Sequence, residues 1–478
     1  FFDITFAGIF VDGFGRLLEA VGTPEWLKVL LADGIGGGIT SVSTFIPPIF
    51  FLFLFLAMLE DSGYMARAAF VMDRVMRALG LPGKAFVPLI VGFGCNAPAI
   101  MATRTMDKAT DRIITIMMAP FMSCGARMPV YVLFATAFFP TNGQNLVFGI
   151  YVIGIIAAII TGFLIKRVVL PGEVSAFVME IPPYHIPTVK GVMMRTWDRL
   201  KAFLNRAGKV IVVICAVLGF LNSWGTDGSF GNEDSEKSVL SEIGYTIAPV
   251  LSPMGVTQEN WPAAVGVFTG IFAKEAVGTL NSLYDQMARD KNAEAAGEGA
   301  AAPAEEEADE GWSLGAILSE AGGTIVDNLA DLGGAFTDPL GIAVDDLSDT
   351  ASAAESQEVT VTTIDMMQKL FGSQLAAFAY LMLVLLYMPC VAAIAAVYRE
   401  AGAAWTLFLA AWTTVLGYST ATIVYRVGTF AQDPLYATVA IVISLGLLAA
   451  LLVFMRNYVK NNRGKGPKVI PIAVAQPS

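Results

Sequence analysis

The chain has 478 residues, of which 55% are hydrophobic and only 15% are charged, and its formal net charge is −11. Soluble domains carry roughly 25% charged residues, so this composition excludes an ordinary soluble protein and indicates an integral membrane protein. Its four cysteines lack tight spacing, which argues against a disulfide framework or a zinc knuckle, and we expect no nucleic-acid partner.

The first residues favour an upstream part of the protein. The chain begins with Phe1 rather than Met, and it lacks the order of basic, apolar and small residues that is typical of a signal peptide. We interpret residues 1–40 as an external or interfacial segment ahead of the first predicted span.

About seven segments are long and apolar enough to cross roughly 30 Å of hydrocarbon, and they predict an all-α, polytopic fold. Two further apolar stretches are short or interrupted, and we interpret them as re-entrant, broken segments. Glycine and proline release backbone groups there, which is tolerated at membrane depth only where protein or water satisfies them. The predicted spans are 41–59, 113–139, 147–165, 209–224, 374–397, 404–425 and 435–454, and the broken segments are 86–101 and 262–284.

Charged residues set the predicted orientation. Basic residues cluster at 67–84, 166–206 and 456–468, which places these regions and the end of the chain in the cytoplasm. The stretch 285–372 is acidic with few Lys or Arg residues, and therefore belongs outside. We interpret it as a solvated loop, because its low hydrophobicity and high charge cannot offset ordering entropy. A cation-concentrating entrance is the alternative.

A broken segment followed by a Cys-bearing span recurs in both halves of the chain. On the predicted topology the halves have opposite orientations, which is the inverted-repeat plan of secondary transporters, with the substrate at the repeat interface. The predicted units are the N-terminal segment 1–40, repeat 1 at 41–170, a cytoplasmic basic loop at 171–208, repeat 2 at 209–284 and 373–425, the acidic external insertion 285–372, and a last membrane helix with a basic cytoplasmic tail at 426–478.

Cysteines beside helix breaks mark the candidate site. Cys95 lies in the run Gly-Phe-Gly-Cys-Asn-Ala-Pro at 92–98, and Cys124 and Cys390 each lie near prolines. A lone membrane cysteine is most simply a small hydrophobic residue. Three at breaks, together with amide and carboxylate groups, instead suit a divalent transition metal, whereas Mg²⁺ or Ca²⁺ would call for oxygen ligands alone.

Ionisable residues inside the apolar segments are few, and each costs about 2.5–3.5 kcal/mol to insert, so they normally pair or face a pathway. Glu275 is the better ligand candidate, because it is a carboxylate in the second broken segment, where its neighbour Lys274 neutralises it. Arg127 either supports the path or pairs with Glu60 or Asp61, which close the first span.

Several long motifs resemble, in the same order, the membrane region of the ferrous iron transport protein B family of prokaryotes. They lie at 59–74, 92–98, 118–127, 269–277 and 386–390. The resemblance implies import of Fe²⁺, as the transported substrate, across the inner membrane through two inverted gate-type repeats. It also implies a GTP-binding domain with Mg²⁺ and a first membrane helix ahead of this chain, with no cofactor in the chain itself.

The same resemblance implies partners and site residues. The partners are the lipid bilayer and a small cytoplasmic protein like ferrous iron transport protein A, and a homo-oligomer is also compatible with the sequence. The gate motifs put Cys95 with Asn96, and Ser123 with Cys124, near the ion path. The full candidate path is Cys95, Asn96, Ser123, Cys124, Glu275 and Cys390, with Gly92, Gly94, Glu60, Asp61, Arg127 and Lys274 as supporting or gating residues.

Other function classes compete with an iron transporter. An organic-solute carrier, such as a nucleoside transporter, is the main alternative, since gate-like repeats could hold a polar small molecule without any need for the cysteines. A receptor that binds partners through the acidic loop is another. A membrane enzyme is disfavoured, because the single histidine, His185, lies on the basic loop and no HExxH or GxSxG motif is found.

Overall fold

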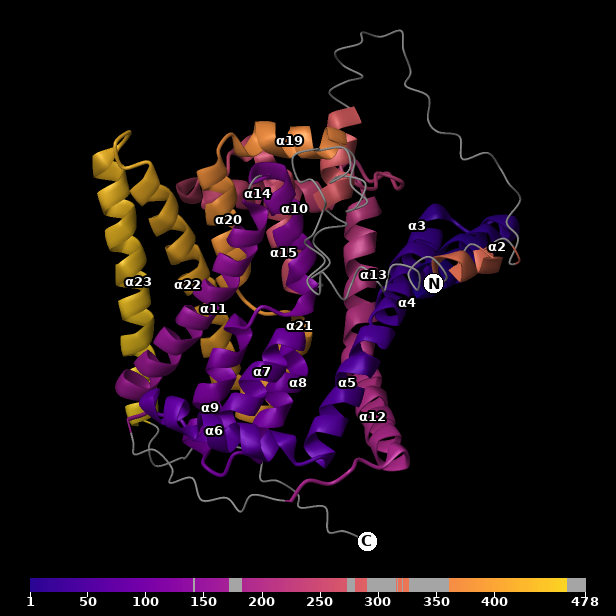
Figure 1. The fold of residues 1–478 in the computed structure, drawn as a ribbon. Helices are drawn as coiled ribbons and strands as arrows, with labels where there is room; N and C mark the ends of the chain where they lie inside the picture. Colours follow the sequence, from indigo (N-terminus) through magenta and orange to yellow (C-terminus); the bar gives the residue numbers. More distant parts are fainter. Residues whose placement is uncertain are drawn as a thin grey trace.

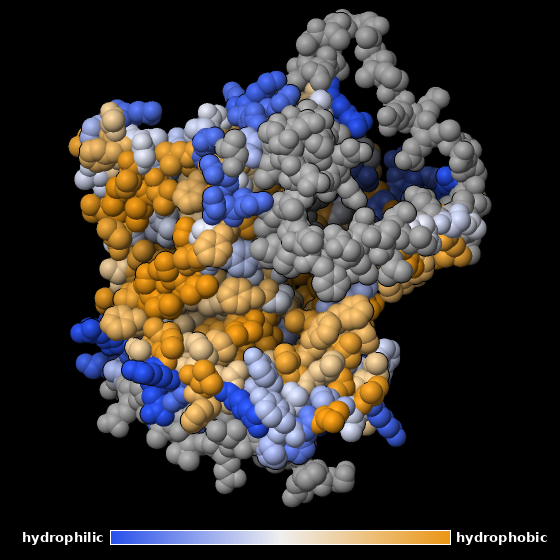
Figure 2. Space-filling model, in the orientation of Figure 1, coloured by the Kyte–Doolittle hydropathy of each residue, from blue (hydrophilic) through white to orange (hydrophobic). Residues whose placement is uncertain are grey.

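The computed structural model describes residues 1–140, 142–171, 183–272, 280–289, 315, 317–319, 321–325 and 361–461. Within these ranges the chain is helical, apart from turns and one isolated β-bridge between Gly225 and Ser238. A belt of apolar side chains separates polar side chains at the two ends of the bundle (Figure 2). The predicted all-α, polytopic membrane fold is confirmed.

Six helices in the described ranges are long and apolar enough to cross a bilayer, and each corresponds to a predicted span. A bent pair, Tyr64–Ala78 with Gly83–Gly94, makes a seventh if it counts as one span, with 106° between its helices. The predicted span 209–224 is instead a shorter apolar helix, α13 (Lys209–Ser223). The six helices are Glu25–Asp61, Ala109–Phe138, Gly143–Val169, Gln374–Ala401, Ala403–Gly428 and Pro434–Asn461.

The bundle in Figure 1 is built from these helices and several shorter ones. Spanning and shorter helices together, the elements of the bundle are α6 (Tyr64–Ala78), α7 (Phe86–Gly94), α8 (Asn96–Ala102), α9 (Ala109–Met118), α10 (Met128–Phe138), α11 (Gly143–Leu164), α12 (Val189–Phe203), α14 (Val239–Leu251), α15 (Trp261–Phe272), α19 (Val361–Phe371), α20 (Gln374–Leu386), α21 (Val391–Ala401), α22 (Ala403–Gly428) and α23 (Pro434–Asn461), in addition to α13.

The helix of the first span begins earlier than predicted. It runs from α3 (Glu25–Lys28) through α4 (Gly37–Thr44) into α5 (Ile46–Asp61), and the short helices before it fold back alongside. Glycines at 34–38 make this stretch look weakly apolar, but they let it approach α13. A Cβ at Gly34 would lie only 2.9 Å from Ala216 Cα, so close packing explains the glycine-rich sequence.

The first predicted broken segment is a helical hairpin. Helices α7 and α8 pack side by side and meet at Cys95, whose extended backbone (φ −156°, ψ 130°) separates them. On either side of the hairpin, Lys84 Nζ and Asp107 Oδ2 lie 3.1 Å apart. The chain therefore returns to the end of the bundle from which it entered, which agrees with the re-entrant interpretation.

The second predicted broken segment closes in a similar way at its base. Helix α15 leads into it, residues 273–279 lie outside the described structure, and the chain is helical again over 280–289. Tyr284 Oη donates to Asn260 Oδ1 at 2.6 Å, which brings the returning chain beside the start of α15. Because α14 and α6 lie at opposite ends of the bundle (Figure 1), the two hairpins enter from opposite ends, which favours the inverted-repeat interpretation.

The segment predicted as a basic loop at 171–208 contains a packed helix. Helix α12 lies against α5, where Arg195 Nη1 is 2.9 Å from Asp61 Oδ1 and Arg199 Nη2 is 2.6 Å from Glu60 Oε2. Its buried residues recur at helical spacing, at Val192, Thr196 and Leu200. A narrow apolar stripe is therefore enough to dock this basic stretch, which its overall polarity obscured.

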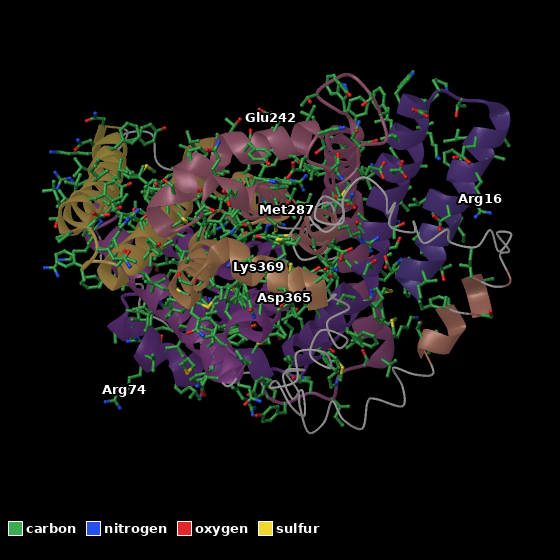
Figure 3. The ribbon with its side chains drawn as sticks, turned by 90° about the horizontal axis from the view of Figure 1, so that it is seen from above. Arg16, Arg74, Glu242, Met287, Asp365 and Lys369 are labelled. Atoms are coloured by element: carbon green, nitrogen blue, oxygen red, sulfur yellow. The ribbon has the colours of Figure 1, made fainter. Side chains whose placement is uncertain are left out.

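The predicted acidic insertion also ends in a packed helix. In α19, Ile364, Met367 and Phe371 are buried, and the Phe371 ring lies 5.4 Å from that of Phe134 in α10. Seen from above, the polar residues Asp365 and Lys369 of α19 lie over the bundle, whereas Arg16 of the N-terminal hairpin lies well to one side (Figure 3). Residues 361–371, which were predicted to belong to the external insertion, thus pack against the bundle.

Candidate functional site

Cys95 forms the tip of the first hairpin and is half-buried. Two glycines before it permit close packing of this tip. A Cβ at Gly92 would lie 3.0 Å from Met122 Cβ, and a Cβ at Gly94 would lie 2.8 Å from Leu52 Cδ1. Side chains at these positions would therefore push the tip away from its neighbours, which gives the predicted supporting glycines a physical role.

Asn96 follows at the start of α8 and is 3% exposed. With the amide oriented to satisfy its hydrogen bonds, Nδ2 donates to Gly92 O at 3.3 Å and to Ala119 O at 2.9 Å. Ala119 begins the turn that precedes Cys124. Asn96 thus ties the hairpin tip to the second Cys-bearing segment.

The predicted span 113–139 is not a continuous helix. It breaks between α9 and α10, where Cys124 is buried and extended (φ −81°, ψ 160°) between short turns at Ala119–Phe121 and Gly125–Arg127. Ser123 is 1% exposed, and its Oγ lies 3.1 Å from Tyr131 Oη. The helix break that the sequence indicated beside Cys124 is therefore present, within a span that was predicted as one segment.

The predicted span 374–397 is broken as well. Between α20 and α21, both Tyr387 (φ −69°, ψ 177°) and Cys390 (φ −56°, ψ 156°) have extended backbones. Gly417 of α22 makes room for this stretch, since a Cβ there would lie 2.8 Å from Tyr387 N. Each half of the chain therefore holds one discontinuous Cys-bearing span.

The three breaks converge within the bundle. Helix α8 packs against α21, and α7 packs against the turn that precedes Cys124. Cys124 and Cys390 are ionisable neighbours of Cys95. In the described residues, no group of three or more His, Cys, Asp or Glu side chains is arranged to hold a metal ion.

Two predicted site residues, Lys274 and Glu275, lie outside the described residues. The remaining cysteine, Cys215, lies on α13, where it packs against α4: a Cβ at Gly38 would lie 3.2 Å from Cys215 Cβ. Cys215 is therefore part of the packing between α13 and α4.

Arg127 does not pair with Glu60 or Asp61, which corrects one of the two expectations for it. Those carboxylates pair with Arg199 and Arg195 of α12. The Arg127 side chain is 1% exposed, and its Nη1 donates to backbone carbonyls instead. Carboxylates at a span end can pair with any nearby helix, so their partner depends on tertiary packing.

A buried ion cluster was not predicted. Glu400 of α21 is 2% exposed and pairs with Arg112 of α9 and with Arg104, whose Nε lies 2.6 Å from Glu400 Oε1. These residues lie just outside predicted apolar segments, where charges usually face water. An acidic residue directly beside an apolar span was the available signal, but its Arg112 partner is 288 positions away.

Two family models match the chain. One, described as Gate: Nucleoside recognition, matches residues 42–138 and 204–404 and includes all three Cys-bearing breaks. The other, Ferrous iron transport protein B C terminus, matches residues 147–199. No solved structure matches the chain.

Curated relatives extend the likeness over nearly the whole chain. The Fe(2+) transporter FeoB of Legionella pneumophila (strain Lens) is 45% identical over 458 residues, which are 95% of this chain and 58% of the relative. The Fe(2+) transporter FeoB of Salmonella typhi is 43% identical over 457 residues, 95% of this chain and 56% of the relative. The chain thus spans little more than half the length of these relatives. Together with its helices and the two family matches, this shows that the chain belongs to the Gate family and represents the membrane region of the ferrous iron transport protein B family.

Proposed function

We propose that this chain forms the ion-conducting part of an Fe²⁺ importer in the prokaryotic inner membrane. The observation that carries the proposal is the convergence of Cys95, Cys124 and Cys390 at three helix breaks. Thiols favour a borderline transition metal over Mg²⁺ or Ca²⁺. The relatives' printed name, Fe(2+) transporter, supports iron as the substrate.

In this proposal the thiols bind the ion, and Glu275 adds a carboxylate from the second broken segment. Asn96 and Ser123 line the path while their hydrogen bonds hold the breaks in place. An interior-negative potential favours inward movement of a dication by about 4.6 kcal/mol per 100 mV, from roughly 2.3 per charge. Import therefore needs a gate more than a pump.

A GTP-binding domain elsewhere in the intact protein would provide that gate. It can shift the path between closed and open states only if its contacts differ between the two states. We place the end of the bundle with α6, α12 and the C-terminal end of α23 in the cytoplasm, because basic residues gather there. A small protein like ferrous iron transport protein A would act at this face, and the acidic insertion would lie outside.

Fe²⁺ uptake into proteoliposomes that hold the intact protein tests the proposal. The variants are Cys95→Ser, Cys124→Ser and Cys390→Ser, and Cys215→Ser is the matched control in a continuous helix. We expect initial uptake to fall roughly tenfold in each path variant, which corresponds to about 1.4 kcal/mol, and to stay unchanged in the control. Wild-type uptake in all three path variants would contradict a thiol-lined path.

An organic-solute carrier is the second candidate, and the description of the Gate family as nucleoside recognition favours it. The same proteoliposomes distinguish the two functions when the flux of labelled nucleoside and the flux of Fe²⁺ are measured in parallel assays. Nucleoside flux without metal flux, unaffected by the cysteine substitutions, would support the carrier and exclude the iron path.

A further inference from the structure

Arg127 contacts both Cys-bearing breaks with one nitrogen atom. Its Nη1 donates to Pro120 O at 3.3 Å and to Leu385 O at 2.7 Å. Pro120 lies in the turn before Cys124, and Leu385 lies in the last turn of α20, before Cys390. The two acceptors therefore belong to different halves of the chain, and Leu385 follows Arg127 by 258 positions.

The local sequence explains why these carbonyls need an external donor. In an α-helix, the carbonyl of residue i accepts from the amide of residue i+4. For Leu385 that residue is Pro389, which has no amide hydrogen. For Pro120 it is Cys124, whose backbone is extended rather than helical. A buried carbonyl without a donor is destabilising, so each break creates an acceptor that the Arg127 guanidinium satisfies.

The rest of the guanidinium supports the same role. Its Nε and Nη2 have no hydrogen-bond partner among the described residues. The ionisable groups around it are the hydroxyls of Tyr131 and Tyr387 and the thiols of Cys124 and Cys390. A buried charge is normally retained with an opposite charge. In the described part of the chain, the contacts that hold Arg127 are the two carbonyls of the helix breaks.

We propose that Arg127 is a positioning residue that clamps the two Cys-bearing breaks to each other and sets the separation between Cys124 and Cys390. The guanidinium replaces the amide that Pro389 cannot supply, so the stretch 387–390 stays open instead of continuing as a helix. The clamp itself does not depend on which solute passes. Its consequence for iron rests on the proposed function, because an ion bound between the two thiols would require their spacing.

A series of bifunctional methanethiosulfonate cross-linkers of increasing length measures the separation between Cys124 and Cys390 in the absence of iron. The test uses the intact protein with Cys124 and Cys390 as its remaining cysteines, and compares Arg127 with Arg127→Met and Arg127→Gln. Gln is too short to bridge both carbonyls but keeps a polar group in case the Met variant does not fold. Arg199→Gln, which removes an exposed ion pair, is the matched control.

We expect the wild type and the Arg199→Gln control to favour one reagent length. Folded Arg127 variants should lose that preference and react at least several-fold more slowly with the favoured reagent. If cross-linking depended on reagent length in a folded Arg127→Gln or Arg127→Met protein as it does in the wild type, the clamp would be overturned. This result is distinguishable from failure of the proposed function, since the thiol substitutions would still abolish or spare Fe²⁺ uptake in their own assay.

A second measurement tests the reason for the clamp. Pro389→Ala supplies an amide that can donate to Leu385 O once residues 386–389 adopt helical geometry, so it should raise the thermal midpoint more in the Arg127→Gln background, where that carbonyl lacks the guanidinium, than in the wild type. Equal shifts in both backgrounds would overturn the argument that the guanidinium stands in for the missing amide.

Discussion

Buried arginines join the two halves of the bundle at two places, and they do so by different chemistry. Near α6, Glu400 pairs with Arg104 and Arg112, so the charges are matched. In the centre, Arg127 binds the carbonyls of Pro120 and Leu385. The ion cluster joins helices through charged side chains, whereas the central contact is made to backbone carbonyls where helices are interrupted. Stability and transport should therefore respond differently at the two places.

The largest expected effect is at the ion cluster. Glu400→Ala leaves the buried guanidinium of Arg112 without its carboxylate, and breaking a buried pair in this way costs about 3–5 kcal/mol of unfolding free energy. Thermal or denaturant unfolding in detergent measures the loss. If Glu400→Ala were no more destabilising than Glu60→Ala, the cluster would not fasten the bundle.

A neutral double replacement sharpens that result. Glu400→Gln combined with Arg112→Gln removes both charges, so it should be less destabilising than the sum of the single variants, with a coupling of roughly 0.5–3 kcal/mol. Additive effects would mean that the two side chains act independently, despite their direct contact.

A smaller effect is expected near the central breaks. Asn96→Ala removes two donated hydrogen bonds, but Ala119 O keeps a hydrogen-bond donor, because it also accepts from Met122 N at 3.1 Å. We therefore expect a loss of about 1 kcal/mol of unfolding free energy for each bond. Fe²⁺ uptake should fall more than this loss of stability explains, because the tie between two breaks is cut. Unchanged uptake would show that Asn96 only packs.

The smallest effect is expected at the pair of Glu60 with Arg199. Both side chains are about one-third exposed, at 35% and 36%. Exposed pairs contribute about 0–1 kcal/mol and weaken with salt. Glu60→Gln should thus leave unfolding nearly unchanged at high salt, and a large, salt-independent loss would contradict this ranking.

Much of the fold could be predicted because it depends on local properties of the chain. Apolar length identified the spanning helices, and glycine and proline around Cys95 identified the first hairpin. Nearby prolines indicated the breaks at Cys124 and Cys390, but hydropathy continues through both spans and does not show where the backbone becomes extended. The packed helices α12 and α19 were hidden by polar residues around a narrow apolar stripe.

The sequence by itself determined which carbonyls lose their helical donor, because a proline four residues on, as Pro389 is for Leu385, has no amide hydrogen. It also determined which segments avoid water. Only the tertiary structure decided that three separate breaks meet, and that Arg127 and Arg112 find partners in the other half of the chain. Those contacts form between helices that are hundreds of residues apart in the chain, and no local sequence pattern specifies which distant helices pack together.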